Sequence, residues 1–117
     1  MLAIKCIKQV EQELKIIESE IERSSINNNA DYLRELKSNQ KKLKEILENY
    51  CEIIKTMPSI ENRLYYRIAY LGENPTQAIR KVAEENYLKD RKPTDVTYIF
   101  KKIYPKIKKY LIFEKNQ

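Results

Sequence analysis

The chain of 117 residues contains no histidine, and it has only one glycine and two cysteines. Because histidine is missing, the usual zinc-binding sets and histidine-based nucleophilic catalysis are excluded. The sequence also contains no glycine-rich phosphate loop and no acidic residues at converging positions. We therefore expect a protein that is not an enzyme and that needs no metal or cofactor.

The shortage of glycine and of long apolar segments restricts the fold and the location. β-Hairpins and barrels need positions of positive φ, which glycine normally supplies, and Gly72 is the only glycine. An all-α fold is therefore favoured. No apolar run reaches the length of about 18 residues that a membrane helix needs, and no signal-peptide pattern opens the sequence. We expect a soluble, cytoplasmic protein without membrane contact, with Cys6 and Cys51 as buried, reduced thiols.

Apolar residues in the first half of the chain alternate at spacings of three and four, as in helices that pack along a heptad seam. The first seam runs through Ala3, Ile7, Val10, Leu14, Ile17 and Ile21. The second follows a polar cluster around Asn28 and runs through Leu33, Leu36, Gln40, Leu43, Leu47, Tyr50, Ile54 and Met57. Residues 1–57 are predicted to form an antiparallel helical hairpin that packs on the rest of the chain or joins two copies in a homodimer. The polar Gln40 within the seam is expected either to fix the register or to face an opening in the bundle.

Local signals predict three further helices in residues 58–117. A proline ends the hairpin, and Ser59 caps a helix over residues 60–71, after which Gly72 takes the left-handed conformation. A helix over residues 75–88 is predicted by the cap and first turn Asn74-Pro75-Thr76-Gln77.

The last predicted helix opens at Thr94 and contains a proline. Because Pro105 lacks an N–H and clashes with the preceding turn, the helix is expected to kink there or to restart near Tyr104. Its expected apolar positions are Val96, Ile99, Phe100, Ile103, Ile107 and Leu111.

The net charge of +6 belongs to the second half of the chain. Residues 1–57 carry ten basic and ten acidic side chains, whereas residues 58–117 carry thirteen and seven. From Lys89 onward there are nine basic residues against three acidic ones, interleaved with tyrosines. A basic surface confined to one helical unit favours binding of a polyanion, most often nucleic acid. The neighbouring acidic residues Glu84 and Glu85 are interpreted as ordinary surface charges.

Short helices joined by a glycine turn and a polar link have the layout of a helix-turn-helix, whose last helix enters the major groove of DNA. In this interpretation Ala83 permits close approach of the last helix, which Val96 and Ile99 anchor. The residues expected to read bases are Thr94, Asp95, Thr97 and Tyr98. The residues expected to bind phosphates are Arg91, Lys92, Lys101, Lys102, Lys106, Lys108 and Lys109. For Asp95, stabilisation of the helix N-terminus is the alternative role.

Two segments carry a resemblance to a known family. They are MPSIENRLYYRIAYLGENPTQAIRKVAE (residues 57–84) and TDVTYIFKKIYPKIKKYL (residues 94–111). Together they resemble the phage late-gene transcription regulators whose C-terminal half is similar to region 4 of bacterial sigma factors. The resemblance implies double-stranded DNA as a partner, RNA polymerase as a second partner, and a helical hairpin ahead of the DNA-binding unit.

Two other functions remain open on the sequence alone. A small terminase subunit for phage DNA packaging also combines a helical hairpin with a helix-turn-helix, although its DNA-binding unit usually comes first in the chain. A phage-encoded inhibitor would instead place the basic face against an acidic groove of a host protein. Neither the DNA sequence that is read nor the oligomeric state follows from these patterns.

Overall fold

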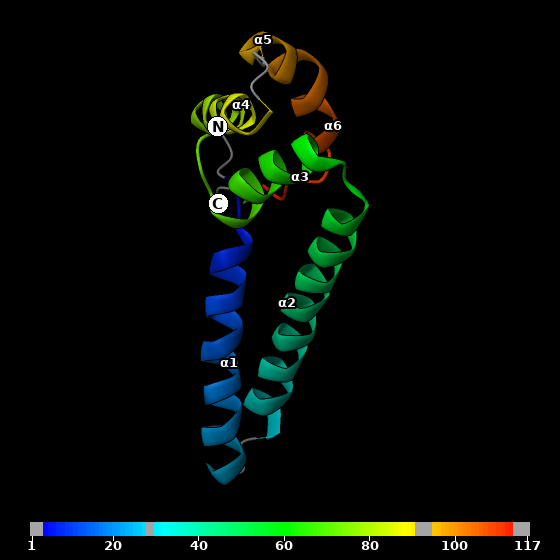
Figure 1. Cartoon of the computed structure of the whole chain (residues 1–117). Helices are drawn as coiled ribbons and strands as arrows, with labels where there is room; N and C mark the ends of the chain where they lie inside the picture. Colours follow the sequence, from blue (N-terminus) through cyan, green and yellow to red (C-terminus); the bar gives the residue numbers. More distant parts are fainter. Residues whose placement is uncertain (1–3, 28–29, 91–94, 114–117) are drawn as a thin grey trace.

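The computed structural model describes residues 4–27, 30–90 and 95–113, and it is built from helices (Figure 1). In chain order these are α1 (Ile7–Asn27), α2 (Ala30–Thr56), α3 (Ser59–Tyr65), η1 (Tyr66–Tyr70), α4 (Pro75–Asp90), α5 (Val96–Tyr98), η2 (Ile99–Ile103) and α6 (Tyr104–Lys108). Within the described ranges the only β pairing is one isolated antiparallel bridge between Ile4 and Phe113. The predicted all-α fold is confirmed.

The molecule is elongated, with extents of 61 × 30 × 19 Å. Helices α1 and α2 run antiparallel and project as an arm from the unit formed by α3 to α6 (Figure 1). Along the arm Leu36 and Leu43 are buried, but most other seam positions, such as Leu14 and Ile17, are only half-buried. Gln40, the polar seam residue, is also half-buried. Two helices without a third cannot enclose their seam, so part of its apolar surface stays in contact with water.

The main core lies where the arm meets the rest of the chain. The arm contributes Ile7 and Tyr50, and the remaining buried members are Leu64, Tyr65, Ile68, Ala69, Ala78, Ile79, Val82, Ala83, Ile99, Ile103, Ile107 and Leu111. Full burial of one such Leu or Ile side chain stabilises a fold by about 1.5–3 kcal/mol. The base of the arm is therefore part of the core, whereas its distal turns are not.

Side-chain hydrogen bonds fix the C-terminal end of α2 and the start of α4. The Asn62 side chain donates to the Ile54 carbonyl at 2.8 Å, where the last carbonyls of α2 lack helical partners. The Asn74 side chain accepts from the Thr76 N–H at 2.9 Å, which confirms the predicted cap of α4. Ser59 was expected to cap α3 but is its first residue, and its hydroxyl accepts from Arg63 instead.

Gly72 has a φ of +76°, as predicted for the residue after the third helix. A Cβ built on Gly72 would lie 3.2 Å from the Cys6 Cβ and 3.3 Å from its Sγ, so this turn closely approaches the residue that precedes α1. Cys6 is buried, but Cys51 is exposed, which contradicts the expectation that both thiols are buried. The reason is the register of α2, which turns the preceding Tyr50 toward the core.

Helix 96–108, made of α5, η2 and α6, contains a wide turn just before Pro105. The Tyr104 N–H donates to the Ile99 carbonyl, five residues back, and α6 then starts at Tyr104 as predicted. The buried side chains of Ile99, Ile103 and Ile107 are four residues apart. In a regular α-helix, residues four positions apart are rotated by about 40° from one another around the helix axis. A turn that is closed by a hydrogen bond between residues five apart contains more residues than an α-helical turn and offsets this rotation. The side chains of all three isoleucines therefore face the core.

Candidate nucleic-acid surface

The N-terminus of helix 96–108 is capped by Asp95. Its Oδ1 accepts a hydrogen bond from the Thr97 N–H at 2.9 Å, so the helix begins at Val96 rather than at Thr94. This bond confirms the alternative role of Asp95 as a stabiliser of the helix start. The other predicted residues of this loop, Arg91, Lys92 and Thr94, lie outside the described residues.

The side of helix 96–108 that faces away from the core gathers several of the predicted DNA-contacting residues. Because Ile99 and Ile103 point inward, the exposed positions on the opposite side of the first turns are Thr97, Tyr98, Lys101 and Lys102. Tyr98 keeps 53% of its surface exposed. Hydroxyl groups and lysines are therefore presented together on one surface.

The predicted phosphate-binding lysines divide into two groups. Lys106 pairs with Glu61 of α3 at 3.6 Å, and the Lys109 Nζ lies 5.0 Å from the centre of the Tyr110 ring. Lys101, Lys102 and Lys108 are exposed, and none of them has an ion pair within the part of the chain that the structure describes. These three lysines carry positive charge that no described neighbour neutralises.

A network of charges that the sequence did not reveal holds α4 against η1. The Arg67 guanidinium bonds to Glu73 at 2.9 Å and also to Glu85, and Lys81 lies 3.6 Å from Glu73. Glu85 was expected to be an ordinary surface charge, but it is half-buried and paired. The second carboxylate oxygen of Glu73 is buried without a hydrogen-bond partner. No periodic pattern links Arg67 to residues 6 and 18 positions away, so only the tertiary structure shows the network.

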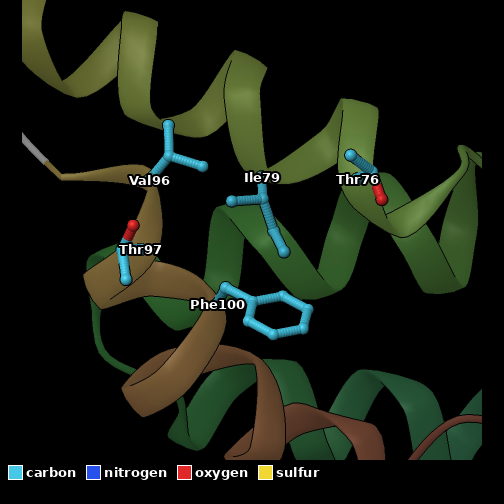
Figure 2. A pocket seen from close by; sticks show the side chains of 5 residues that line it. All are labelled: Thr76, Ile79, Val96, Thr97 and Phe100. Carbon is cyan, nitrogen blue, oxygen red and sulfur yellow. The ribbon is translucent and has the colours of Figure 1, made fainter.

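An apolar hollow of about 220 Å³ lies between α4 and the start of helix 96–108 (Figure 2). Its lining is Thr76, Ile79, Val96, Thr97 and Phe100. Val96 and Phe100 were expected in the buried stripe, but 42% and 57% of their surfaces are exposed. The stripe of Ile99, Ile103 and Ile107 takes the core positions, which leaves Val96 and Phe100 on one flank of the helix. The Phe100 ring stacks on Tyr104, with ring centres 6.1 Å apart.

Several tyrosines cluster where the arm meets the unit formed by α3 to α6. Tyr50 stacks on Tyr65 at 5.5 Å and contacts Tyr70 at 6.0 Å, while Tyr66 stacks on Tyr70 at 5.2 Å. Tyr65 is buried and Tyr70 half-buried, so these two tyrosines of α3 and η1 face inward. Burial, with a smaller effect of Tyr110, raises the pKa of Tyr65 to about 12. Burial also raises the pKa of Tyr50. These phenols serve packing and stay neutral.

Comparison with protein-family models, with curated proteins and with solved structures found no match. None of the helices in the described ranges is long and apolar enough to cross a membrane. Among the same residues, no group of three or more cysteine and acidic side chains is placed to hold a metal ion.

Proposed function

We propose that the chain is a small DNA-binding protein, a transcription regulator of a phage or another mobile element, which reads duplex DNA with helix 96–108. The observation that carries the proposal is the exposed side of this helix. It combines Lys101 and Lys102, which have no ion pair among the described residues, with Thr97 and Tyr98, while Ile99 and Ile103 of the same helix are buried in the core. A surface of this composition suits DNA because cations bind phosphates while hydroxyls bond to base edges.

The contrast between paired and unpaired cations supports this assignment. Arg67, Lys81 and Lys106 of the C-terminal unit serve intramolecular ion pairs. Lys101 and Lys102, by contrast, have no described carboxylate partner. Each lysine that binds a phosphate releases counterions, so affinity should fall steeply as salt rises. Asp95 faces the same region, but its carboxylate is engaged by the Thr97 N–H.

The arm formed by α1 and α2 is proposed to join two copies of the chain. Its seam positions Leu14, Ile17 and Ile21 are only half-buried, and a second arm would remove them from water. A twofold dimer of this kind would read two half-sites about one helical turn of DNA apart. RNA polymerase is proposed as a further partner on the basis of the sequence resemblance alone.

A titration of random-sequence duplex DNA, followed by fluorescence anisotropy at rising salt, tests the proposal. The double variant Lys101→Glu with Lys102→Glu should bind at least tenfold more weakly at low salt, because two phosphate contacts become repulsive. The matched control reverses Lys37 and Lys41, which are exposed on α2 and change the net charge equally. Failure of the wild-type protein to bind any duplex at low salt would refute the proposal, as would equal losses in the two variants.

Measurements on the same wild-type and variant proteins distinguish two alternative functions from the proposed one. Rings of many subunits, detected by mass measurement in solution, would indicate DNA packaging rather than regulation. The exposed Val96 and Phe100 favour a protein-interaction module as the second candidate. In that case the protein would capture a defined host protein, and its duplex binding would be weak and unaffected by Lys101 and Lys102.

A further inference from the structure

The apolar hollow adjoins the surface proposed to read DNA. Thr97 belongs to both, because it lines the hollow and is exposed at the first turn of helix 96–108. Residues three and four positions apart on a helix are neighbours, so Thr97 lies beside both Phe100 and Lys101. The hollow and the exposed side of the helix that carries Lys101 therefore adjoin each other at Thr97.

The hollow is a preformed apolar site. In Figure 2 the Phe100 ring and the Ile79 side chain point into the same space between α4 and η2. Ile79 is buried, whereas Phe100 is 57% exposed and is held by its stacking on Tyr104. Val96, on the same flank of the helix, leaves 42% of its surface exposed beside this space. Filling the hollow would cover the Phe100 ring.

The size and the surroundings of the hollow select its ligand. Its volume of about 220 Å³ is smaller than that of most ligand pockets, which start at about 300 Å³. Thr76 and Thr97 contribute hydroxyl groups to its lining, and Lys101, exposed one helical turn from Thr97, places a positive charge near it that suits a polyanion. In the major groove of DNA the apolar group on a base edge is the 5-methyl of thymine, which aliphatic and Phe side chains contact.

We propose that the hollow receives the methyl-bearing edge of thymine, with Phe100, Val96 and Ile79 as the residues that distinguish thymine from the other bases. This inference rests on the proposed DNA binding and names the base that this part of the surface reads. The methyl leaves water when it enters the hollow. Burial of one such group should favour thymine over its methyl-free analogue uracil by about fourfold.

The test uses two pools of short random-sequence duplexes, one made with thymine and the other with deoxyuridine in its place. The pools differ only in the methyl groups, and they compete for the full-length protein at moderate salt. Wild-type protein should retain the thymine pool about fourfold better. Phe100→Ala should bring the ratio near one, with little change in affinity for the uracil pool. The control Ile16→Ala removes a similarly exposed apolar side chain, 59% exposed, from the arm and should keep the preference.

Each outcome has a separate meaning. If neither pool binds, the proposed function fails and this inference fails with it. If both pools bind equally well, DNA binding stands and the thymine contact is refuted, which leaves the hollow to an apolar segment of a protein partner. Loss of binding to both pools by the same factor in Phe100→Ala would also overturn the inference, provided that circular dichroism shows an intact helical fold.

Discussion

Replacement of Gly72 by alanine should destabilise the protein by about 2 kcal/mol. Gly72 has a φ of +76°, and a residue with a Cβ pays about 1–2 kcal/mol in this left-handed region. The new Cβ would also lie 3.2 Å from the Cys6 Cβ and 3.3 Å from its Sγ. Such overpacking costs about 1 kcal/mol or more when backbones must move apart. The smaller entropy of the unfolded alanine chain offsets about 0.4–1 kcal/mol of this total.

The assay is urea unfolding at neutral pH, followed by far-ultraviolet circular dichroism, which reports the helices. Two further variants separate the contributions. Gly72→Asn keeps the contact with Cys6 but tolerates the left-handed conformation, so it should recover about half of the loss. Gly72→Ala in a Cys6→Ala background removes the Sγ contact and keeps the strained φ.

Two results would refute this reasoning. The first is a Gly72→Ala variant whose unfolding free energy lies within about 0.5 kcal/mol of wild type, since the φ penalty alone exceeds that value. The second is a Gly72→Asn variant that is less stable than Gly72→Ala. It would show that the contact with Cys6, and not the backbone conformation, decides which residue is tolerated at this turn.

Three further perturbations test other parts of the structure. Asp95→Ala should lose about 1 kcal/mol of stability, because it removes the helix cap. Asp95→Asn should keep the cap and strengthen duplex binding, because it removes a carboxylate near the phosphates. Chemical unfolding measures the stability of both variants, and anisotropy measures their binding to duplex DNA. Arg67→Met should destabilise the fold by about 1–3 kcal/mol in urea unfolding, since it leaves two half-buried carboxylates side by side, and an effect near zero would contradict the network. Burial raises the Tyr65 pKa from 10.0 to about 12, so the stability that it contributes is complete below pH 10 and is lost as pH rises toward 12. The difference in tyrosinate absorbance between the wild type and Tyr65→Phe separates this phenol from the exposed tyrosines. It should appear together with the loss of circular dichroism in that interval, and its appearance near pH 10 without unfolding would contradict the burial of Tyr65.

Features set by local chemistry could be predicted from the sequence. The cap at Asn74 depends on neighbouring residues, and the left-handed Gly72 depends on its own lack of a Cβ, so a short window of sequence contains both. The same holds for the restart of the last helix at Tyr104, next to Pro105. The inward stripe of Ile99, Ile103 and Ile107 was also predicted, because apolar spacing carries that information.

The errors arise where the register depends on packing between distant segments. Spacing alone placed Val96 and Phe100 in the core, because a regular helix allows them there. Because of the wide turn before Pro105, residues four apart (Ile99, Ile103 and Ile107) occupy the core, and the flank of the helix that carries Val96 and Phe100 stays exposed. Glu85 was taken as a surface charge because its partner Arg67 belongs to another helix. The hollow beside Phe100 therefore had no sequence signal, although it now defines the candidate base-reading site.

The bridge near the two ends of the described chain has a consequence for measuring cooperativity. The Lys5 N–H donates to the Ile112 carbonyl at 2.7 Å, beside the Ile4 and Phe113 pairing. This amide can exchange its hydrogen with solvent only when the segment before α1 separates from the segment after α6. If the Lys5 amide hydrogen exchanges more slowly than the amide hydrogens of the distal arm, both segments stay in place while the arm opens independently. One backbone amide thus serves as a site-specific probe of sub-global opening.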